Sequence, residues 1–358
     1  MKIYLVGGAI RDALLDAPVT ERDWVVVGSS PQEMIELGYK PIGKDFPVFL
    51  HPETKEEYAL ARTERKVKKG YQGFDFYFDA DVRLEEDLKR RDLTINAIAK
   101  DQEGNLIDPY HGQQDIKNKT FRHVSDAFAE DPVRILRVAR FAAKLPHFSL
   151  AEATITLMKR MSENGEVDAL VAERVWKEFE KSLHLSSPQR FFEVLIACDA
   201  QNILWPYISD AEIQSLTAIS TSNADAHCRF ACLCHTLSKQ NLDTLIKTYR
   251  IPKLFAELAL LCRQHANDYR LLDTTCAESI YTLIRQVDGL RRPERLTSFC
   301  SAIEYGTPSS KQQLLQTAVT AIQQVDSSQL QSLNLKGKAF ADALKIEQIK
   351  AIEDQLNY

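Results

Sequence analysis

The first 197 residues contain no cysteine, because all seven cysteines of the chain fall at or after Cys198. A disulfide framework that spans the chain is therefore excluded. The sequence also lacks an apolar run long enough to cross a membrane, and the apolar stretch at its start is too short for a signal peptide. We expect a cytoplasmic protein.

Low-complexity tracts are absent too, and 44% hydrophobic and 27% charged residues make an ordinary globular composition. A length of 358 residues allows two or three domains with a sizeable core. The formal net charge of -5 does not decide for or against nucleic-acid binding, because a basic face can coexist with an acidic remainder.

Glycine is scarce after residue 122, where few of the 13 glycines lie, and the pattern of the sequence changes there. Before this point, short β-rich runs alternate with turns that contain Gly and Pro. After it, apolar residues recur at three- and four-residue intervals, as in amphipathic helices. We predict an α+β fold, with a small mixed α/β head followed by an elongated all-α part. The expected strands are Ile3–Val6, Trp24–Val27, Val48–Leu50 and Glu57–Arg62, and a mobile loop is expected over Lys66–Asp81.

Two acidic residues stand at the start of the second expected strand. Residues two apart in an extended chain share a face, so Glu21 and Asp23 should lie side by side. Binding of Mg²⁺, a hard cation that prefers oxygen ligands, would relieve their repulsion and suits metal-assisted phosphoryl transfer. A solvated strand end is the alternative. Glu57, on another strand, is either a third carboxylate of this site or a surface residue beside Glu56.

The first expected strand runs into two glycines, followed closely by Arg11 and Asp12. Paired glycines let the backbone approach a ligand, and a helix that opens just past them offers free N–H groups to phosphate. Arg11 would add a charged fork to the same phosphate oxygens. A tight turn at Gly7 and Gly8 is the alternative.

The stretch Lys89–Ile98 combines a basic cluster with apolar residues that we expect to form one buried helix face. Arg91, Asp92 and Asn96 are then placed to fix one another and to bind a triphosphate. Such a cluster is usually a solvated helix end, but the phosphate site inferred above favours the binding role.

Arginines recur every three residues, at Arg134, Arg137 and Arg140, on an expected helix with Pro132 near its first turn. Asp131 precedes Arg134 by about one turn, and the pair has both donor and acceptor character. Such a pair can address the edge of a nucleobase. An exposed ion pair with i,i+3 spacing is the alternative.

Cysteines at 228, 232 and 234, followed by His235, invite a zinc interpretation. The segment is mostly apolar and helical in character, and free cysteine is a common core residue. We therefore expect buried thiols there and no metal site.

Four motifs occur in a fixed order, Gly-Gly-Ala-x-Arg-Asp, Glu-x-Asp-Trp, Arg-Arg-Asp-x-x-x-Asn-Ala and Glu-Asp-x-x-Arg-x-x-Arg-x-x-Arg. In this order they resemble the class II tRNA nucleotidyltransferases. These are the bacterial and eukaryotic CCA-adding enzymes of the polymerase-β-like superfamily, and bacterial poly(A) polymerases share their head. The resemblance is dense over residues 1–145 and thin afterwards. It implies a nucleotidyltransferase head over residues 1–122, a helical neck over 123–197 and a helical body and tail over 198–358.

The resemblance implies untemplated addition of C, C and A to the 3′ end of tRNA, with CTP and ATP as substrates and Mg²⁺ as cofactor. Poly(A) tailing or partial addition of CCA is the alternative with the same chemistry. An RNA-binding protein with a decayed catalytic head is the alternative from another class. The segment over residues 62–85 matches the flexible loop associated with the switch from C to A addition, and no protein partner is implied.

The resemblance also assigns roles to the motif residues. Glu21 and Asp23 would hold magnesium and carry the catalysis. Asp131 and Arg134 would imitate a template base. The other nucleotide-binding residues would be Gly8 and Arg11 for the incoming nucleotide, Arg91 for its triphosphate, and Arg137 and Arg140 for the rest of the pocket.

Two positions depart from the family pattern. The usual first metal ligand is Asp, whereas Glu21 is one methylene longer, so we expect activity with a shifted metal geometry. The segment Leu233–Lys239 resembles the His-Asp-x-Gly-Lys signature of a phosphohydrolase domain fused to some relatives, but Thr236 replaces the metal-binding Asp. Thr is a poor metal ligand beside Asp. We expect a degenerate scaffold without phosphohydrolase activity.

Overall fold

A computed structural model describes residues 1–42, 48–66, 74–77, 79–326, 328 and 336–356 of the chain. Contacts between Cα atoms divide it into two compact units, one formed by Met1–Phe179 with Arg190–Trp205 and the other by Glu180–Gln189 with Pro206–Tyr358. In the part of the chain that is described, no helix is both long and apolar enough to cross a membrane.

The first unit is built on a seven-stranded sheet in the order β3-β4-β5-β2-β1-β8-β9. Most neighbouring strands are antiparallel, but β2 and β5 are parallel. A separate hairpin joins β6 and β7. The strands are β1 Lys2–Val6, β2 Asp23–Val27, β3 Lys40–Pro41, β4 Val48–Leu50, β5 Glu57–Leu60, β6 Thr63–Lys66, β7 Phe74–Tyr77, β8 Ala99–Lys100 and β9 Leu106–Ile107.

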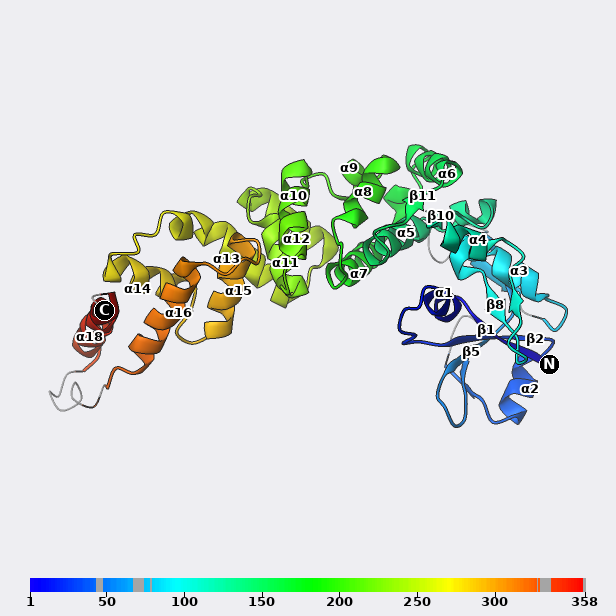
Figure 1. Ribbon diagram of the computed structural model, residues 1–358, viewed down its shortest axis with the longest axis horizontal. Helices are drawn as coiled ribbons and strands as arrows, with labels where there is room; N and C mark the ends of the chain where they lie inside the picture. Colours follow the sequence, from blue (N-terminus) through cyan, green and yellow to red (C-terminus); the bar gives the residue numbers. More distant parts are fainter. Residues whose placement is uncertain (43–47, 67–73, 78, 327, 329–335, 357–358) are drawn as a thin grey trace. The chain divides into compact units, whose positions relative to one another are not determined.

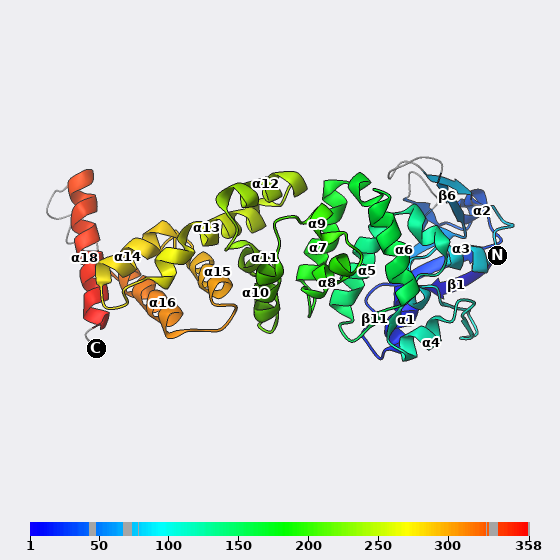
Figure 2. The ribbon, with the colours of Figure 1, turned by 90° about the horizontal axis from the view of Figure 1, so that it is seen from above.

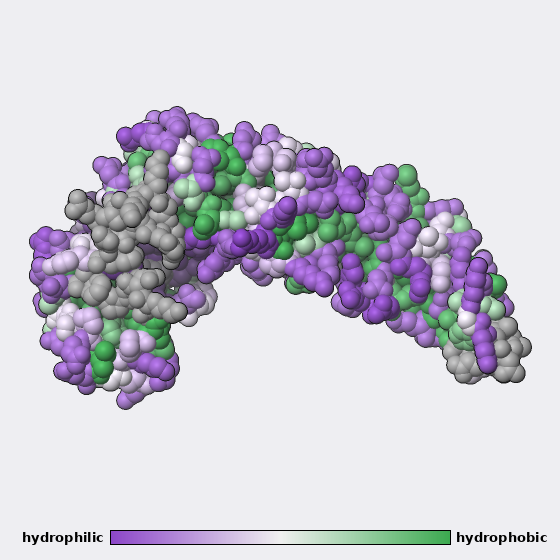
Figure 3. Space-filling view, turned by 180° about the vertical axis from the view of Figure 1, so that it is seen from behind, coloured by the Kyte–Doolittle hydropathy of each residue, from purple (hydrophilic) through white to green (hydrophobic). Residues whose placement is uncertain are grey.

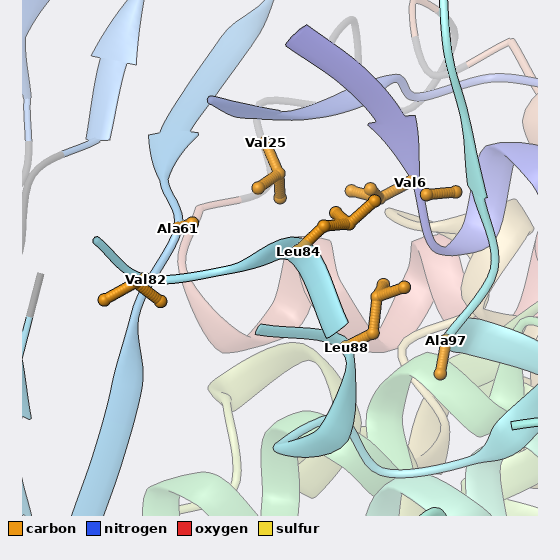
Figure 4. Close-up of a cluster of buried hydrophobic side chains, with 8 residues drawn as sticks. Val6, Val25, Ala61, Val82, Leu84, Leu88 and Ala97 are labelled. Atoms are coloured by element: carbon orange, nitrogen blue, oxygen red, sulfur yellow. The ribbon is translucent and has the colours of Figure 1, made fainter. Parts of the chain in front are cut away.

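Successive residues of each strand point to opposite sides of the sheet, so both faces carry apolar side chains. A helix covers each face. Val25 packs in one buried cluster with Val6 and Leu88 (Figure 4), so helix α3 (Leu84–Lys89) covers that face. Val26, the next residue of β2, packs in a second buried cluster with Met34, so helix α2 (Pro31–Glu36) covers the other face. Burial of apolar surface on both faces fixes the register of the central strands.

The order of the strands brings three strand ends together at one edge of the sheet (Figure 1). β1 and β2 are antiparallel, with Val6 opposite Asp23, so the end of β1 meets the start of β2. β2 and β5 are parallel, with Asp23 opposite Glu57, so the start of β5 lies there too. The same end of the sheet therefore holds the residues that the sequence pointed to, 7–12, 21–23 and 57.

The remaining elements of the first unit are mainly helices, and α5 packs against α8. A short parallel pair, β10 Thr120–Phe121 and β11 Ser149–Leu150, precedes and follows α5. The α-helices are α1 Gly8–Leu14, α2 Pro31–Glu36, α3 Leu84–Lys89, α4 Gly112–Lys117, α5 Val133–Lys144, α6 Glu152–Glu163, α7 Ala172–Leu183, α8 Arg190–Ala197 and α9 Gln201–Leu204. The last residues of α7, from Glu180, belong to the second unit. Single 3₁₀ turns are η1 Thr94–Asn96, η2 Asp126–Glu130 and η3 Val167–Ala169.

The second unit is helical. Helix α11 is its centre and packs against α10, α13 and α15, while α18 lies against α14 and α16 (Figure 2). Hydrophilic side chains cover most of the face drawn in Figure 3, with apolar ones between them. The helices are α10 Asp210–Ser220, α11 Ala226–Cys234, α12 Lys239–Tyr249, α13 Lys253–Arg270, α14 Ala277–Gln286, α15 Pro293–Ile303, α16 Ser310–Gln323 and α18 Lys338–Leu356.

The architecture confirms the predicted α+β fold, a mixed sheet followed by helices, and each of the four expected strands is present. The compact units place most of the expected neck with the head, so the three-part division at residues 122 and 197 stays a prediction. Part of the expected loop, residues 67–73 and 78, lies outside the described residues.

The predicted helix face over Lys89–Ile98 is wrong. Helix α3 ends at Lys89, and Thr94–Asn96 form a 3₁₀ turn. The chain leaves the helix because Leu93 bridges to His123 and the Thr94 N–H donates to the Arg122 carbonyl at 2.9 Å. Tertiary pairing thus overrides the local helical pattern.

Candidate active site

The carboxylates of Glu21 and Asp23 lie in a cavity of about 520 Å³ at the meeting point of the strand ends. The cavity is lined by residues from two segments, Val19–Asp23 and Lys55–Glu57. The position of Asp23 is set by its pairing with Val6 on one side and Glu57 on the other. The structure thus brings together the acids that the sequence predicted to act together.

The surroundings of Asp23 set its protonation. Burial raises the pKa of Asp23, the Arg91 guanidinium lowers it, the neighbouring carboxylate of Glu21 raises it, and Arg137 lowers it, with a net rise. A rise caused by desolvation and by a neighbouring carboxylate is what a dication would reverse, because its charge favours the ionised form of both acids.

The donor set of this cavity fits a hard cation. Glu21 and Asp23 supply carboxylate oxygens, which Mg²⁺ prefers. Among the residues that the structure describes, no three His, Cys, Asp or Glu side chains converge closely enough to hold a metal ion. The site therefore offers two carboxylates from the protein, and Glu57 lines the same cavity without completing a group of three.

The glycine pair forms a close approach beside these acids. Gly7 has φ of +72°, and its N–H donates to the Ile98 carbonyl at 3.2 Å. A Cβ added at Gly7 would lie 2.9 Å from Arg91 Nη1, the end of a flexible side chain, so the positive φ is what favours glycine here. Gly8, the predicted binding residue, is the first residue of α1. The conformational requirement therefore falls on Gly7 and not on Gly8, the predicted binding residue.

A chain of hydrogen bonds joins Arg11 to Arg137 of α5. Arg11 Nη1 donates to Asn96 Oδ1 at 2.7 Å, and Asn96 Nδ2 donates to Asp92 Oδ1 at 2.9 Å. Arg137 Nε donates to Asp92 Oδ2 at 2.7 Å. Burial alone would raise the pKa of Asp92, but Arg137, Asn96 and the backbone N–H of Leu93 hold it well below its usual range. Asp92 is therefore an ionised anchor that orients Arg137.

Three of the predicted nucleotide-binding arginines contact the ring of Phe141. The guanidinium carbons of Arg140, Arg11 and Arg137 lie 4.5, 5.0 and 5.7 Å from the ring centroid. Cations within about 6 Å of a phenyl centroid are attracted by its negative face. Arg140 also pairs with Glu178 of α7 at 2.5 Å. Neither Phe141 nor Glu178 was singled out from the sequence, because each contact depends on tertiary packing.

Arg91 does not join Asp92 and Asn96 as predicted. The Asp92–Asn96 bond is present, but Arg91 Nη2 pairs with Asp87 Oδ2 at 3.2 Å. The expectation that these three residues fix one another is therefore correct for two of them and wrong for Arg91.

The start of α5 holds the predicted base-reading pair. Asp131 Oδ1 accepts the Val133 N–H at 3.1 Å and lies 3.7 Å from Arg174 Nη1. Arg134 is buried, and its Nη1 donates to the Ala127 carbonyl at 2.8 Å. Arg174, on α7, has no signal in the sequence that would link it to Asp131.

The second unit contains the cysteine cluster and the degenerate signature. Cys228, Cys232 and Cys234 are buried on α11. His235 is buried, with Nδ1 2.7 Å from the Cys232 carbonyl and Nε2 2.8 Å from Arg270 Nη2. These contacts fix a neutral imidazole, and burial lowers the pKa of His235. Thr236 Oγ1 donates to Glu212 Oε1 at 2.7 Å, so it has a structural partner.

Comparison with known proteins agrees with this geometry. Residues 3–122 match the family described as the poly(A) polymerase head domain, and residues 147–212 match that described as the probable RNA and SrmB-binding site of polymerase A. A CCA-adding enzyme of Coxiella burnetii (strain RSA 331 / Henzerling II) is 50% identical over 357 residues, which cover 98% of this chain and 95% of that protein. A multifunctional CCA protein of Methylobacillus flagellatus is 48% identical over 341 residues, covering 85% of this chain and 83% of that protein.

A solved structure shows the same fold. The Bacillus stearothermophilus CCA-adding enzyme in complex with CTP superposes with a TM-score of 0.70 at 22% identity, covering 99% of this chain and 89% of that chain. The resemblance that the four motifs indicated is thereby confirmed. The chain belongs to the family of CCA-adding enzymes.

Proposed function

We propose that Glu21 and Asp23 are the metal-binding and catalytic residues with which this chain adds C, C and A to the 3′ end of tRNA. As a member of the CCA-adding family, the chain is a nucleotidyltransferase that uses CTP and ATP. The observation that carries the assignment is the meeting of the β1, β2 and β5 ends, which puts both carboxylates beside Gly7, Gly8 and Arg91.

Nucleotidyltransferases of this kind use a divalent metal ion, and we propose Mg²⁺ because both protein ligands are carboxylates. When bound, Mg²⁺ supplies the positive charge that stabilises the attacking 3′ oxygen and the leaving pyrophosphate. The protein contributes by presenting Glu21 and Asp23, at the start of β2, to one cavity. The reaction joins the tRNA 3′ oxygen to the α-phosphorus of the nucleotide as the bond to pyrophosphate breaks.

The arginines near the carboxylates bind and orient the triphosphate in this account. Arg91 lies against Gly7, and it is close enough to Asp23 to lower the pKa of that carboxyl. The Arg91 guanidinium can therefore bind a phosphate that lies beside the carboxylates. Arg11 approaches the same region from α1, and Gly8 leaves room for the nucleotide near the backbone. These donors carry fixed charge and need no proton transfer of their own.

The base of the nucleotide is selected at α5. We assign the Watson–Crick edge to Asp131 and Arg134 and the rest of the pocket to Arg137 and Arg140. The support for the pocket is the network through Asp92 and Phe141, which links Arg137 and Arg140 to Arg11 and so to the triphosphate side. For Asp131 and Arg134 it is their position at the start of the same helix. A protein surface with fixed donors and acceptors can choose C or A without a nucleic-acid template.

The division of labour follows from these sites. We propose that residues 1–122 bind metal and triphosphate, that residues 123–197 select the base, and that residues 198–358 bind the body of the tRNA. The absence of a protein disulfide framework and the tRNA substrate favour a cytoplasmic location. The region around Thr236 keeps a helical scaffold without phosphohydrolase chemistry.

Poly(A) tailing and partial CCA addition are the alternatives. The matches to poly(A) polymerase domains are consistent with poly(A) tailing. One experiment separates them. Transcripts of tRNA that end before, within and after CCA are incubated with CTP, ATP and Mg²⁺, and their 3′ ends are sequenced. We expect completion to CCA and then arrest. A long A tail would indicate poly(A) tailing. Arrest after CC, or failure to add any C, would indicate partial addition of CCA.

A further inference from the structure

A fully buried carboxylate lies behind the triphosphate side of the site. Asp87 of α3 has 0% of its surface exposed. Its Oδ1 accepts Arg90 Nη2 at 2.6 Å and the Arg62 N–H at 3.3 Å, and its Oδ2 accepts Arg91 Nη2 at 3.2 Å. An isolated buried carboxylate is strongly unfavourable, so these partners are required by its position.

The charges around Asp87 keep it ionised. Burial would raise its pKa, but the guanidinium groups of Arg90 and Arg91, with the bond from Arg90 and the charge of Arg62, hold the pKa below its usual value. The Asp87 side chain is completely covered, whereas the side chains of Arg90 and Arg91 are 17% and 18% exposed to solvent. Asp87 is therefore the fixed point of this cluster.

Asp87 connects two functional parts of the first unit. On one side Arg62, which also accepts Arg90 Nε through its carbonyl at 3.2 Å, directly precedes the hairpin of β6 and β7. On the other side Arg91 reaches Gly7 beside the carboxylates. Arg91 Nε is buried and finds no hydrogen-bond partner among the residues described, so the orientation of its guanidinium depends on Asp87.

We propose that Asp87 is a positioning residue that orients Arg91 toward the nucleotide triphosphate and ties it to the base of the hairpin at Arg62. This inference rests on the proposed role of Arg91. Asp87 touches neither substrate nor metal in this account and acts through Arg91 alone. A rotation of Arg91 would move its charge away from the phosphates, so loss of Asp87 weakens nucleotide binding before it affects the chemical step.

The test compares Asp87→Asn with Arg91→Ala and with the double variant, all as full-length chains acting on tRNA that lacks CCA. Asn has the same size and can still accept the Arg62 N–H, but it loses the charge that holds Arg91. We expect the KM for CTP and for ATP to rise about tenfold in Asp87→Asn with kcat nearly unchanged, as when binding is weakened equally in the ground and transition states. In the Arg91→Ala background, Asp87→Asn should add no further rise, because the two residues act as one unit.

Controls separate positioning from folding. Leu84→Ala removes a buried apolar side chain from the same helix, so it should lower Tm with little change in KM. Asp87→Glu keeps the charge, so its KM should rise less than that of Asp87→Asn. If Asp87→Asn does not fold, Asp87→Glu takes its place, and we expect its KM to lie between those of wild type and Arg91→Ala.

Two outcomes would overturn the inference and one would overturn its basis. If Arg91→Ala raises KM while Asp87→Asn changes only Tm, as Leu84→Ala does, Asp87 has a structural role alone. Additive effects of Asp87→Asn and Arg91→Ala would also contradict the inference. If Arg91→Ala itself leaves KM unchanged, the proposed role of Arg91 fails first.

Discussion

Replacing Phe141 by Leu tests whether one ring organises the nucleotide pocket. The side chain is only 5% exposed, so Leu fills most of the same apolar space but removes the ring face that Arg11, Arg137 and Arg140 share. The expected consequence is looser placement of all three guanidinium groups, with the carboxylate and amide partners of each arginine retained.

The magnitude follows from the three contacts. A cation–π contact contributes about 0.5–1 kcal/mol at an exposed site and about 2 kcal/mol when desolvated. Each arginine keeps a second anchor, such as Asp92 for Arg137 and Glu178 for Arg140, so the contributions are not fully lost. The contacts exist before the nucleotide binds, so part of their loss lowers the stability of the fold. We assign about 1–2 kcal/mol to reordering the three guanidinium groups on binding, a rise of about five- to thirtyfold in the KM for CTP and ATP. The change in packing alone should cost about 1 kcal/mol of unfolding free energy.

The assay is steady-state incorporation of CTP and ATP into tRNA that lacks CCA, together with thermal unfolding. Phe148→Leu is the matched control, because Phe148 is 4% exposed in the same unit and contacts Phe121 at a centroid distance of 5.1 Å. We expect both variants to lose stability, while only Phe141→Leu raises KM. Equal KM values in the two variants would show that the ring of Phe141 only fills space.

Three further outcomes are expected. Asp131→Ala should lose about ten- to a hundredfold of the preference for CTP and ATP over UTP and GTP, since a bidentate base contact contributes about 1–3 kcal/mol of discrimination; competition among all four nucleotides measures it, and an unchanged order of preference would leave Asp131 a structural residue. Arg91→Ala should move the acidic limb of the pH profile of kcat/KM to higher pH, because Arg91 lowers the pKa of Asp23 and activity requires the ionised carboxylate; a limb at the wild-type pH would separate the two residues. With Thr236 bonded to Glu212, the protein should not hydrolyse 2′,3′-cyclic nucleotides with Ni²⁺ or Mg²⁺, and hydrolysis that His235→Ala abolishes would contradict this.

The parts of the site that the sequence predicted are those set by local geometry. Asp23 opens β2 and Glu21 lies two residues before it, so closeness in the chain brings both acids to one cavity. Arg134 is the second residue of α5 and Asp131 lies two residues before that helix, so both belong to one helix end. The four motifs also carried the family resemblance, which the relatives confirm.

The contacts that the sequence did not predict join residues far apart in the chain. Lys144 pairs with Asp12 at 2.8 Å and so links the end of α5 to α1, and neither residue carries a local signal for the other. Arg91 differs, because its partner Asp87 is only four residues away. The spacing pointed to Asp92, but the chain leaves the helix at Lys89 and Asp92 binds Arg137, which is 45 residues away. Tertiary packing, which no single stretch of sequence contains, decides such partners.

The most direct test of the metal assignment is 3′-end sequencing of tRNA after reaction with Asp23→Ala in saturating CTP, ATP and Mg²⁺. We expect added C and A to fall to background while tRNA binding stays near that of wild type, because the metal acts on the reacting oxygens and not on the body of the RNA. Glu21→Asp, which shortens the other carboxylate by one methylene, should remain active. Extension of tRNA by Asp23→Ala at the wild-type rate would contradict the assignment of the catalytic carboxylates.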